Sequence, residues 1–459
     1  IYNIINILLT FSAFFCYNVK KADFFMNERA TLKVNKLNHL EIGGVDCEVL
    51  AKEYGTPLYV MDEAHIENMC KAYLDAFNTE NVKGKVIYAS KAFCCKEIYR
   101  LLKRLGVSAD VVSGGELFTA LSTEFSANDL IFHGNNKTVS ELEFALDSGI
   151  GYVVVDSYQE ALNLQEICAK KGISQKVLIR INPGVEAHTH HYIQTAKIDS
   201  KFGFSISNGD AKKIVEQVLS LKNLSLLGLH CHIGSQIFDE KSFLIAVDKM
   251  LDFYKEIRDD FNVDFSVLNL GGGFGIWYSE GDRKFSYKDY TTNTISIIKR
   301  VKEGTFARGL VMPEIFIEPG RSLVGEAGIT LYSVGNVKTI KDVKNYLAID
   351  GGMFENPRFA LYQAKYTVLS ALNMDKTCVN KYTIAGKCCE SGDIIAEDVM
   401  LPEVNVGDVL AVLSTGAYNY SMSSNYNRNL IPSVVFVKDG HHRVVVKGQT
   451  YEDLIRNDI

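Results

Sequence analysis

The segment "KVIYASKAFCC", residues 85–95, places a lysine directly behind an apolar run. Residues 86–89 are typical of a buried β-strand. Side chains alternate between the two faces of a strand, so Ile87, Ala89 and Lys91 are expected to share one face, which points inward. Two explanations are open for an ammonium group there. Its head either reaches solvent or an ion-pair partner, or its amine is desolvated and reacts with a cofactor.

The same pattern recurs up to residue 320: a short apolar run ends in small or polar residues, and a helical pattern follows. The runs are residues 85–90, 108–113, 130–134, 151–156, 176–182, 226–233, 267–274 and 314–320. Continuous apolar strands are typical of a parallel sheet covered on both faces. Eight β-α units in about 240 residues fit an α/β fold, the TIM-type (β/α)8 barrel. An open doubly wound sheet is the alternative, and the even alternation favours closure.

The segments between these runs carry signals for helix boundaries. Thr138 with Glu141, and Ser157 with Glu160, have the spacing of a capping box at a helix N-terminus. Gly106 follows a helical pattern and is expected to end that helix. These signals support an alternation of strands and helices.

The sequence changes character after residue 325. Patterns of half-buried strands occur at residues 328–337, 345–352, 381–387, 408–415 and 433–448. The last one contains Asp439-Gly440, which predicts a hairpin. We therefore expect a barrel at 59–325 and an all-β domain, sandwich- or barrel-like, at 326–459. Residues 26–58 are expected to join the β-domain.

The composition is globular and limits the partners. The chain has 459 residues, of which 47% are apolar, and its net charge is −6. Without a basic block, nucleic acid is not expected as a partner. Ten cysteines show no metal-ligand spacing, and the adjacent pairs Cys94-Cys95 and Cys388-Cys389 are interpreted as reduced thiols. We predict a cytoplasmic protein that acts on a small molecule and has no membrane partner.

The first 25 residues stand apart from the rest. They are apolar but have no initiator methionine and no basic residue ahead of the apolar run. That run is short for a membrane span. Met26 is the first methionine and starts a stretch with the composition of a soluble protein. We expect residues 1–25 to be upstream sequence outside the functional protein, with a targeting leader as the alternative.

Polar and glycine-rich clusters fall at the carboxyl ends of the predicted strands. They are Lys91, residues 113–115, residues 133–136, Asp156, residues 182–184, residues 230–232, residues 271–273 and residues 318–321. The active site of a (β/α)8 barrel lies at this end. So many coincidences together predict an enzyme.

The residue types of these clusters suit pyridoxal 5'-phosphate (PLP). PLP needs a reactive lysine, a phosphate cradle and a partner for its pyridine nitrogen. The run "LGGGFG" (270–275) offers unobstructed backbone N–H groups to a phosphate. Glu318 can face the pyridine nitrogen, and Arg321 can bind a phosphate or a carboxylate. A local ion pair between Glu318 and Arg321 is the alternative.

Two histidines share one strand face in "HCHIGS" (230–235). The spacing of His230 and His232 suits a metal pair, but no third ligand is evident, so no metal is predicted. A histidine that stacks on a cofactor ring fits better. The tract "HTHH" (188–191) lies in an expected loop and is interpreted as solvated or substrate-gating.

Several motifs together resemble diaminopimelate decarboxylase. They are "YASKAF", "HGNNK", "HCHIGSQI", "NLGGGFGI", "EPGRSLV", "CCESGD" and "GAYNYSMSSNYN", and the resemblance runs from about residue 38 to the C-terminus. This family consists of PLP enzymes with an alanine-racemase-like barrel, related to ornithine and arginine decarboxylases. The resemblance implies decarboxylation of meso-2,6-diaminopimelate to L-lysine, the last step of lysine biosynthesis. It also implies a head-to-tail homodimer with shared active sites.

The resemblance assigns roles to individual residues. It implies that Lys91 carries the cofactor, that His232 stacks on its ring and that Glu318 is the partner of the pyridine nitrogen. The other implied cofactor residues are Ser235, Gly272, Gly273, Gly320, Arg321 and Tyr418. Cys389 is implied as the general acid. The implied substrate residues are Arg321, Arg358, Tyr362, Glu390 and Tyr418. Asn419 stands where the family commonly has glycine.

The residue chemistry agrees with this assignment. Loss of CO2 leaves a carbanion, which the protonated pyridine ring delocalises and a thiol can protonate. The far end of diaminopimelate carries an ammonium and a carboxylate, which Glu390 and Arg358 complement. Decarboxylation of another basic amino acid (ornithine, arginine or lysine) or of carboxynorspermidine is the alternative. An inactive homologue that binds a partner protein and a structural or metal-binding barrel are further alternatives.

Overall fold

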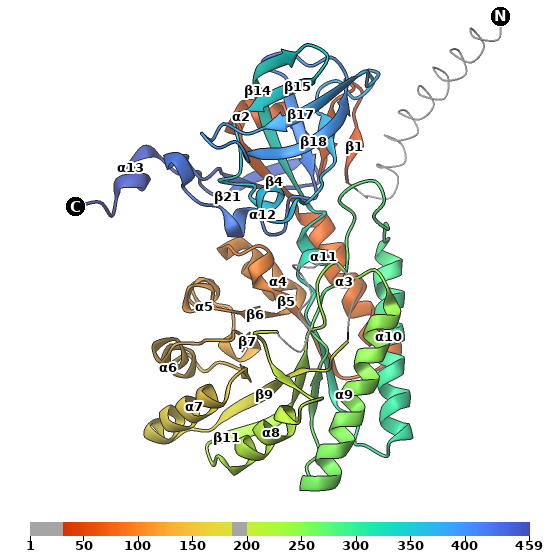
Figure 1. Ribbon diagram of the computed structural model, residues 1–459, viewed down its shortest axis with the longest axis vertical. Helices are drawn as coiled ribbons and strands as arrows, with labels where there is room; N and C mark the ends of the chain where they lie inside the picture. The colour runs from red at the N-terminus through yellow and green to blue at the C-terminus, as the bar shows by residue number, and fades with distance from the viewer. Residues whose placement is uncertain (1–30, 186–199) are drawn as a thin grey trace, which may run out of the picture. The chain divides into compact units, whose positions relative to one another are not determined.

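The computed structural model describes residues 31–185 and 200–459 (Figure 1). The expected leader at residues 1–25 and the tract 188–191 lie outside these ranges. The chain forms two compact units. Asn68–Ile276 and Arg283–Leu323 form one, called the barrel unit here. The described residues up to Glu67 form the other, the β-unit, together with Trp277–Asp282 and Val324–Ile459.

The barrel unit is built on eight parallel strands, which confirms the predicted fold class. They are β5 (Gly84–Ala89), β6 (Ser108–Val111), β7 (Leu130–Phe132), β8 (Tyr152–Val155), β9 (Gln175–Asn182), β11 (Leu224–Cys231), β12 (Val267–Asn269) and β13 (Glu314–Ile317). Pairing of β8 with β9 closes the sheet, so the open alternative is wrong. A short strand, β10 (Phe204–Ser205), pairs with β9 in addition.

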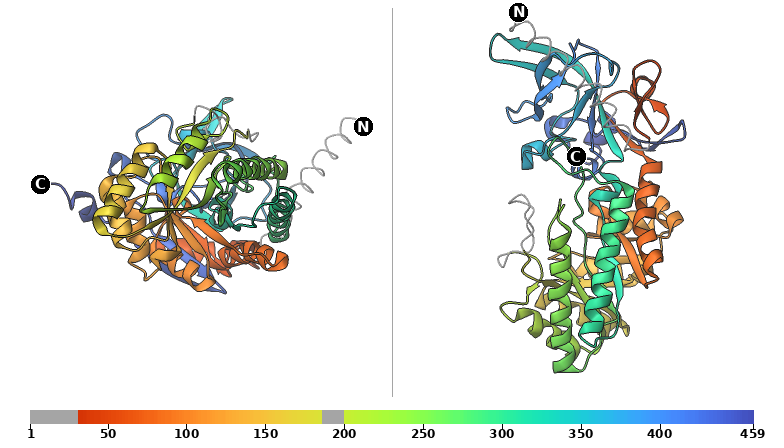
Figure 2. Two further views of the ribbon diagram at one scale, coloured as in Figure 1. Left: turned by 90° about the horizontal axis from the view of Figure 1, so that it is seen from below. Right: turned by 90° about the vertical axis from the view of Figure 1, so that its right-hand side faces the viewer.

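Helices follow the strands and surround them (Figure 2, left). They are α4 (Lys96–Leu105), α5 (Gly114–Leu121), α6 (Val139–Asp147), α7 (Tyr158–Lys171), α8 (Asp210–Ser220), α9 (Glu240–Phe261) and α10 (Tyr287–Ala307). After β13 only the short α11 (Arg321–Val324) forms. Helix α3 (Glu63–Glu80), which precedes β5, packs beside α10: Thr291 donates to the carbonyl of Ala72, and Lys302 pairs with Glu80.

The predicted helix caps are partly confirmed. Thr138 and Glu141 form the full reciprocal capping box, and Gly106 ends α4 with a φ of 69°. Ser157 accepts the N–H of Glu160, but the Glu160 carboxylate lies 2.8 Å from Lys137 Nζ instead of returning to the cap. The second box is therefore only half formed, because a buried ion pair takes up its carboxylate.

The β-unit is a mostly antiparallel sheet in the order β18-β17-β15-β14-β4-β20-β21, with β19 joined to β14 and to β16. Its strands are β4 (Leu58–Asp62), β14 (Gly328–Ile340), β15 (Lys344–Ile349), β16 (Val368–Ser370), β17 (Asn380–Ala385), β18 (Ile394–Leu401), β19 (Val409–Leu413), β20 (Val434–Lys438) and β21 (His441–Val446). The five predicted strand segments and the hairpin at Asp439-Gly440 are confirmed. Strands β16 and β18 were not anticipated.

Smaller elements complete the β-unit. A three-stranded sheet contains β1 (Lys33–Val34), β2 (Leu40–Ile42) and β3 (Val45–Asp46), and the helices are α2 (Cys47–Tyr54), α12 (Arg358–Tyr362) and α13 (Tyr451–Ile455). Because β4 pairs with β14 and β20, residues up to Glu67 lie with this unit. Trp277 belongs to its hydrophobic core.

Two general observations concern the described residues. Their nine cysteines are all free thiols. None of the helices in residues 31–185 and 200–459 has the length and apolar character needed to cross a membrane.

Candidate active site

The barrel interior changes from apolar to polar toward the carboxyl ends of its strands. An apolar layer contains Ile87, Ile131, Val154, Leu178, Val267 and Phe316. The residues two positions further along share the same strand face. After Ile87 this position holds Ala89, and after the other five it holds His133, Asp156, Arg180, Asn269 and Glu318. The barrel interior is thus filled by an apolar layer, and a mostly polar and charged layer follows it at the carboxyl ends of the strands.

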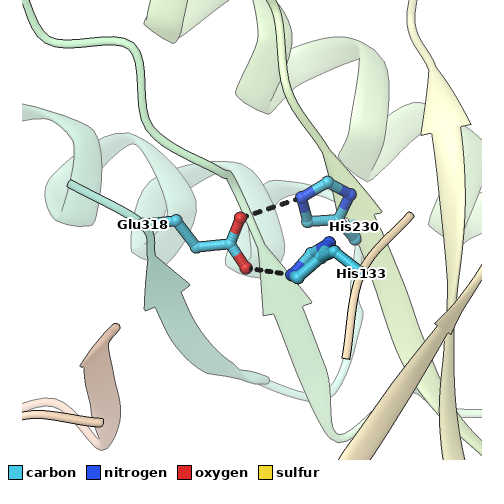
Figure 3. A group of neighbouring side chains, drawn as sticks. All are labelled: His133, His230 and Glu318. Carbon is cyan, nitrogen blue, oxygen red and sulfur yellow. Dashed lines mark hydrogen bonds and ion pairs between the residues drawn. The ribbon is translucent and has the colours of Figure 1, made fainter. Parts of the chain in front are cut away.

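Glu318 is the centre of this polar layer. Its Oε1 accepts hydrogen bonds from His133 Nε2 and Asn269 Nδ2, both at 2.7 Å. Its Oε2 accepts from His230 Nε2 at 3.1 Å. Figure 3 shows both imidazole rings pointing at the carboxylate. Three donors, from the carboxyl ends of β7, β11 and β12, therefore fix the orientation of one buried carboxylate.

The same donors keep Glu318 ionised. Burial would raise its pKa, but His133 and His230 hold the pKa of Glu318 well below its usual value. Burial lowers the pKa of His230 to about 4, so its ring is neutral at pH 7. The site therefore presents a fixed negative charge inside the barrel.

Lys91 lies in a turn rather than on a strand. Strand β5 ends at Ala89, and Lys91 is the middle residue of the 3-10 turn η1 (Ser90–Ala92). The prediction of a buried, inward strand position is wrong: Lys91 is exposed. The cause is Asp110, which accepts the N–H of Ser90 at 2.8 Å and turns the chain. Lys91 remains close enough to lower the pKa of Asp110 and of His232.

The glycines of the predicted cofactor segments allow close packing of the backbone. A Cβ on Gly272 would overlap the carbonyl of Glu318, and one on Gly273, whose φ is +107°, would overlap the carbonyl of Gly234. Gly320 packs against Ala89 so closely that a Cβ there would lie 2.7 Å from the Ala89 Cβ. These positions, called the glycine cradle here, therefore require glycine, because neighbouring backbone segments pack too closely for a side chain.

Three further predicted residues flank this cradle. Arg321 Nη2 donates to Ser235 Oγ at 3.1 Å, so the structure brings both together. His232 Nδ1 accepts the N–H of Gly272 at 3.3 Å. Burial and the nearby charge of Lys91 hold the pKa of His232 well below its usual value, so its ring is neutral. A neutral ring can stack on a cationic aromatic ligand without repulsion.

Of four further groups of this site, the sequence interpretation missed Asp110, Arg180 and Asn269, and it placed His133 in a strand-end cluster without giving it a role. Burial raises the pKa of Asp110 to about 6, and Asn269 uses its Oδ1 to accept the N–H of Gly271 at 2.9 Å. The available signal was the strand period, because three of the four follow an apolar layer residue by two positions. His133, His230 and Glu318 also lie close enough to one another to hold a metal ion, a group that does not include His232 of the predicted pair.

The β-unit holds Arg358, the predicted carboxylate-binding residue, at the start of α12. Its guanidinium is buried, donates to Tyr366 Oη at 2.8 Å and lies 4.6 Å from the ring centroid of Tyr278. Burial disfavours the charge, but the two phenols raise the pKa of Arg358 above its usual value. Tyr362 lies one turn further on and is 38% exposed. Asn419 accepts from Tyr366 Oη at 3.3 Å, which links this unusual residue to the arginine.

The "CCESGD" segment is held by its own last residue. Asp393 accepts the N–H of Cys388 at 2.7 Å and that of Met353 at 2.6 Å. Cys389 and Glu390 are exposed on the loop between these anchors. Tyr418 has a φ of 63°, a conformation that is rare outside glycine and that is found at functional sites.

Comparisons with known proteins define the class. Residues 63–325 match the family "Pyridoxal-dependent decarboxylase, pyridoxal binding domain". The match contains the barrel strands, the glycine cradle and the Glu318 cluster described above. The fold and the site thus belong to the PLP-dependent decarboxylases.

Full-length relatives narrow this class. The diaminopimelate decarboxylase of Bacillus subtilis is 50% identical over 94% of this chain and 97% of its own length. The structure of the enzyme from M. jannaschii with L-lysine superposes with a TM-score of 0.87 at 35% identity, over 95% of this chain and 99% of that one. That from Helicobacter pylori with L-lysine gives 0.80 at 30%, over 89% and 98%. The chain belongs to the diaminopimelate decarboxylase family of carboxy-lyases.

The cofactor of this family, PLP, fits the residues present. The glycine cradle excludes side chains where a phosphate needs backbone N–H groups. Glu318 is already anionic and rigid, as a partner of a protonated pyridine nitrogen must be. Lys91, on its exposed turn beside His232, would be the covalent attachment point.

Proposed function

We propose that this enzyme decarboxylates meso-2,6-diaminopimelate to L-lysine and CO2, the last step of lysine biosynthesis. The observation that carries the proposal is the 50% identity to a diaminopimelate decarboxylase over 94% of the chain. Buried Arg358, held by Tyr366, supports it further, because a substrate with a distal carboxylate needs such a cation.

Within the barrel unit, PLP supplies an electron sink for the carbanion that remains when CO2 leaves. Glu318 keeps a negative charge beside the pyridine nitrogen, and neutral His232 covers the ring. Ser235, Gly272, Gly273, Gly320 and Arg321 hold the phosphate side of the cofactor. The Lys91 amine would hold the cofactor covalently.

Within the β-unit, the proposed roles concern the substrate. Cys389 donates a proton to the substrate carbon that has lost CO2, and Glu390 binds the distal ammonium. Arg358 and Tyr362 bind the distal carboxylate together with Arg321. Tyr418 contacts both the phosphate and the substrate. The exposed positions of Cys389 and Glu390 on an anchored loop support these roles.

We also propose a homodimer in which each active site combines residues of two subunits. The support is the division of the chain: Lys91, His232, Glu318 and the other cofactor residues except Tyr418 lie in the barrel unit, whereas Cys389, Glu390 and Tyr418 lie in the β-unit. A two-fold pair gives two equivalent composite sites. A cytoplasmic location remains a prediction, and the nine free thiols of the described residues are compatible with it.

The alternative is a decarboxylase of ornithine, arginine, lysine or carboxynorspermidine. Initial rates with each compound and with meso-diaminopimelate decide between them. The proposal expects kcat/KM for meso-diaminopimelate to exceed the others by at least about 100-fold, because a site with a buried cation discriminates against substrates that leave it unpaired. A preference for any of the other compounds would refute it.

A further inference from the structure

His133 makes one of the two shortest contacts to the carboxylate that faces the cofactor. It follows β7 and lies two residues beyond the apolar layer residue Ile131, so its ring enters the barrel interior. It is buried, and its Nε2 lies 2.7 Å from Glu318 Oε1. Figure 3 shows the ring aimed at this oxygen from the side opposite the Glu318 backbone.

The hydrogen bonds of Glu318 are unequally shared between its oxygens. A carboxylate oxygen accepts about two hydrogen bonds. Oε1 already accepts two, from His133 and Asn269, whereas in the described part of the chain Oε2 accepts only the one from His230. Oε2 is therefore the oxygen with a lone pair left for a pyridine N–H.

The three donors are not interchangeable. Asn269 cannot turn its amide, because its Oδ1 is occupied by the N–H of Gly271. His230 contributes a neutral N–H, and among the described residues its Nδ1 has no hydrogen-bond partner, as suits an unprotonated nitrogen. The charged groups Lys91, Asp110 and Arg180 also act on this cluster. His133, which follows β7, is thus the donor that fixes the position of Glu318 Oε1 from that strand.

We propose that His133 is a positioning residue for the cofactor: its Nε2–H holds Glu318 so that Oε2 keeps the pyridine nitrogen protonated. This proposal rests on the proposed function and deepens it, because the electron sink depends on that proton. A bound metal ion is the competing explanation of the cluster. Ligands of a tetrahedral zinc, each about 2.0–2.2 Å from the ion, stand further apart than the 2.7 Å between His133 and Glu318.

The test uses a pair of variants that differ in reach. In His133→Gln the side-chain amide nitrogen can take the place of Nε2, whereas in His133→Asn it reaches only the place of Nδ1. Both are polar and of similar bulk, so a folding defect should affect them alike. Ile131→Val, which removes one methylene from the same strand, controls for lost packing.

Each protein is reconstituted with PLP labelled with 15N in the ring, and the pyridine nitrogen is observed by solid-state NMR at pH 7. The wild-type enzyme, Ile131→Val and His133→Gln should show the shift of a protonated nitrogen. His133→Asn should show a neutral nitrogen, with kcat lower by about tenfold or more and KM within about twofold, because one charge-assisted hydrogen bond is lost.

Two results would overturn the inference. One is a protonated nitrogen and an unchanged kcat in His133→Asn. The other is one equivalent of zinc retained by the PLP-free wild-type enzyme and lost in His133→Asn. Failure of this inference can be told apart from failure of the proposed function. Wild-type enzyme that binds no PLP or forms no lysine would refute the proposed function itself.

Discussion

The backbone N–H of Ser90 donates to the Asp110 carboxylate at 2.8 Å, and the Ser90 hydroxyl donates to the Asp110 carbonyl at 2.6 Å. This double contact ends β5 at Ala89, two residues before Lys91, and sets the turn that contains the lysine. The position of the reactive amine thus depends on a buried carboxylate from the neighbouring strand.

The cofactor should be attached to Lys91. Treatment of the holoenzyme with borohydride and digestion, followed by mass spectrometry, should find the pyridoxyl group on the peptide that contains Lys91. The lysine beside the Glu318 cluster is the one whose charge acts on His232 and Asp110. A pyridoxyl group on another lysine would refute the assignment.

Replacement of Asp110 should loosen the turn. Asp110→Ala removes the acceptor of the Ser90 N–H and should lower the free energy of unfolding by about 1–3 kcal/mol, the cost of an unsatisfied buried donor. Asp110→Asn keeps an oxygen at this position and should lose much less. Urea unfolding of the two variants measures the difference, and equal losses would show that the hydrogen bond is not the cause.

The sequence was sufficient for elements that depend on local patterns. Eight short continuous apolar runs predicted eight strands and the polar clusters at their ends. The alternation of side chains along a strand misplaced Lys91, because the turn is set by Asp110, which lies 20 residues away from Ser90 in the sequence. His133 was placed at a strand end but was given no role for a similar reason, since its partner Glu318 is 185 residues distant.

The substrate residues of the β-unit were assigned by resemblance, and local patterns could not have found their support. Arg358 depends on Tyr366, eight residues further on, and on the ring of Tyr278, which comes from a separate segment of the chain. The strand period does not predict such contacts, because they arise only when the unit packs.

Loss of the Arg358 guanidinium should affect the substrate more than the cofactor. Arg358→Ala should lower kcat/KM for meso-diaminopimelate by about 30-fold to several thousandfold, which corresponds to about 2–5 kcal/mol for a buried charge-assisted contact. The dissociation constant of PLP should change little. Arg443→Ala, which removes an arginine paired with Glu63 in the same unit, is the matched control. An unchanged kcat/KM in Arg358→Ala would make this arginine structural.

Glu355 should make the enzyme less stable as the pH rises. It is fully buried, and burial raises its pKa from 4.5 to about 8. Between these values the folded chain holds a proton that the unfolded chain has released, so stability falls with increasing pH. Glu355→Gln removes this dependence and keeps an acceptor for Tyr332 Oη and the Gly352 N–H.

Chemical denaturation at pH 5 and at pH 8 tests this. The free energy of unfolding of the glutamine variant, relative to that of the wild-type enzyme, should rise by about 3–4 kcal/mol from the lower to the higher pH. The reason is that over most of this range Glu355 holds about one more proton in the folded chain than in the unfolded chain, which costs about 1.4 kcal/mol for each pH unit. A stability difference that does not depend on pH would contradict the assignment to Glu355.

Shared sites in a dimer should allow two inactive variants to rescue each other. Lys91→Ala and Cys389→Ala should each be nearly inactive. After co-refolding in equal amounts, about half of the dimers are mixed and about a quarter of all sites carry neither substitution. About a quarter of the wild-type activity should return. A mixture as inactive as its components would exclude the shared-site dimer.

Product analysis tests the central claim most directly. The PLP-loaded enzyme is incubated with meso-2,6-diaminopimelate, and CO2 and lysine are quantified, the latter by chiral chromatography. Decarboxylation at one end of the substrate predicts one CO2 and one L-lysine for each molecule consumed, and no turnover by Lys91→Ala. Failure of the wild-type enzyme to form L-lysine, or equal turnover by Lys91→Ala, would contradict this account.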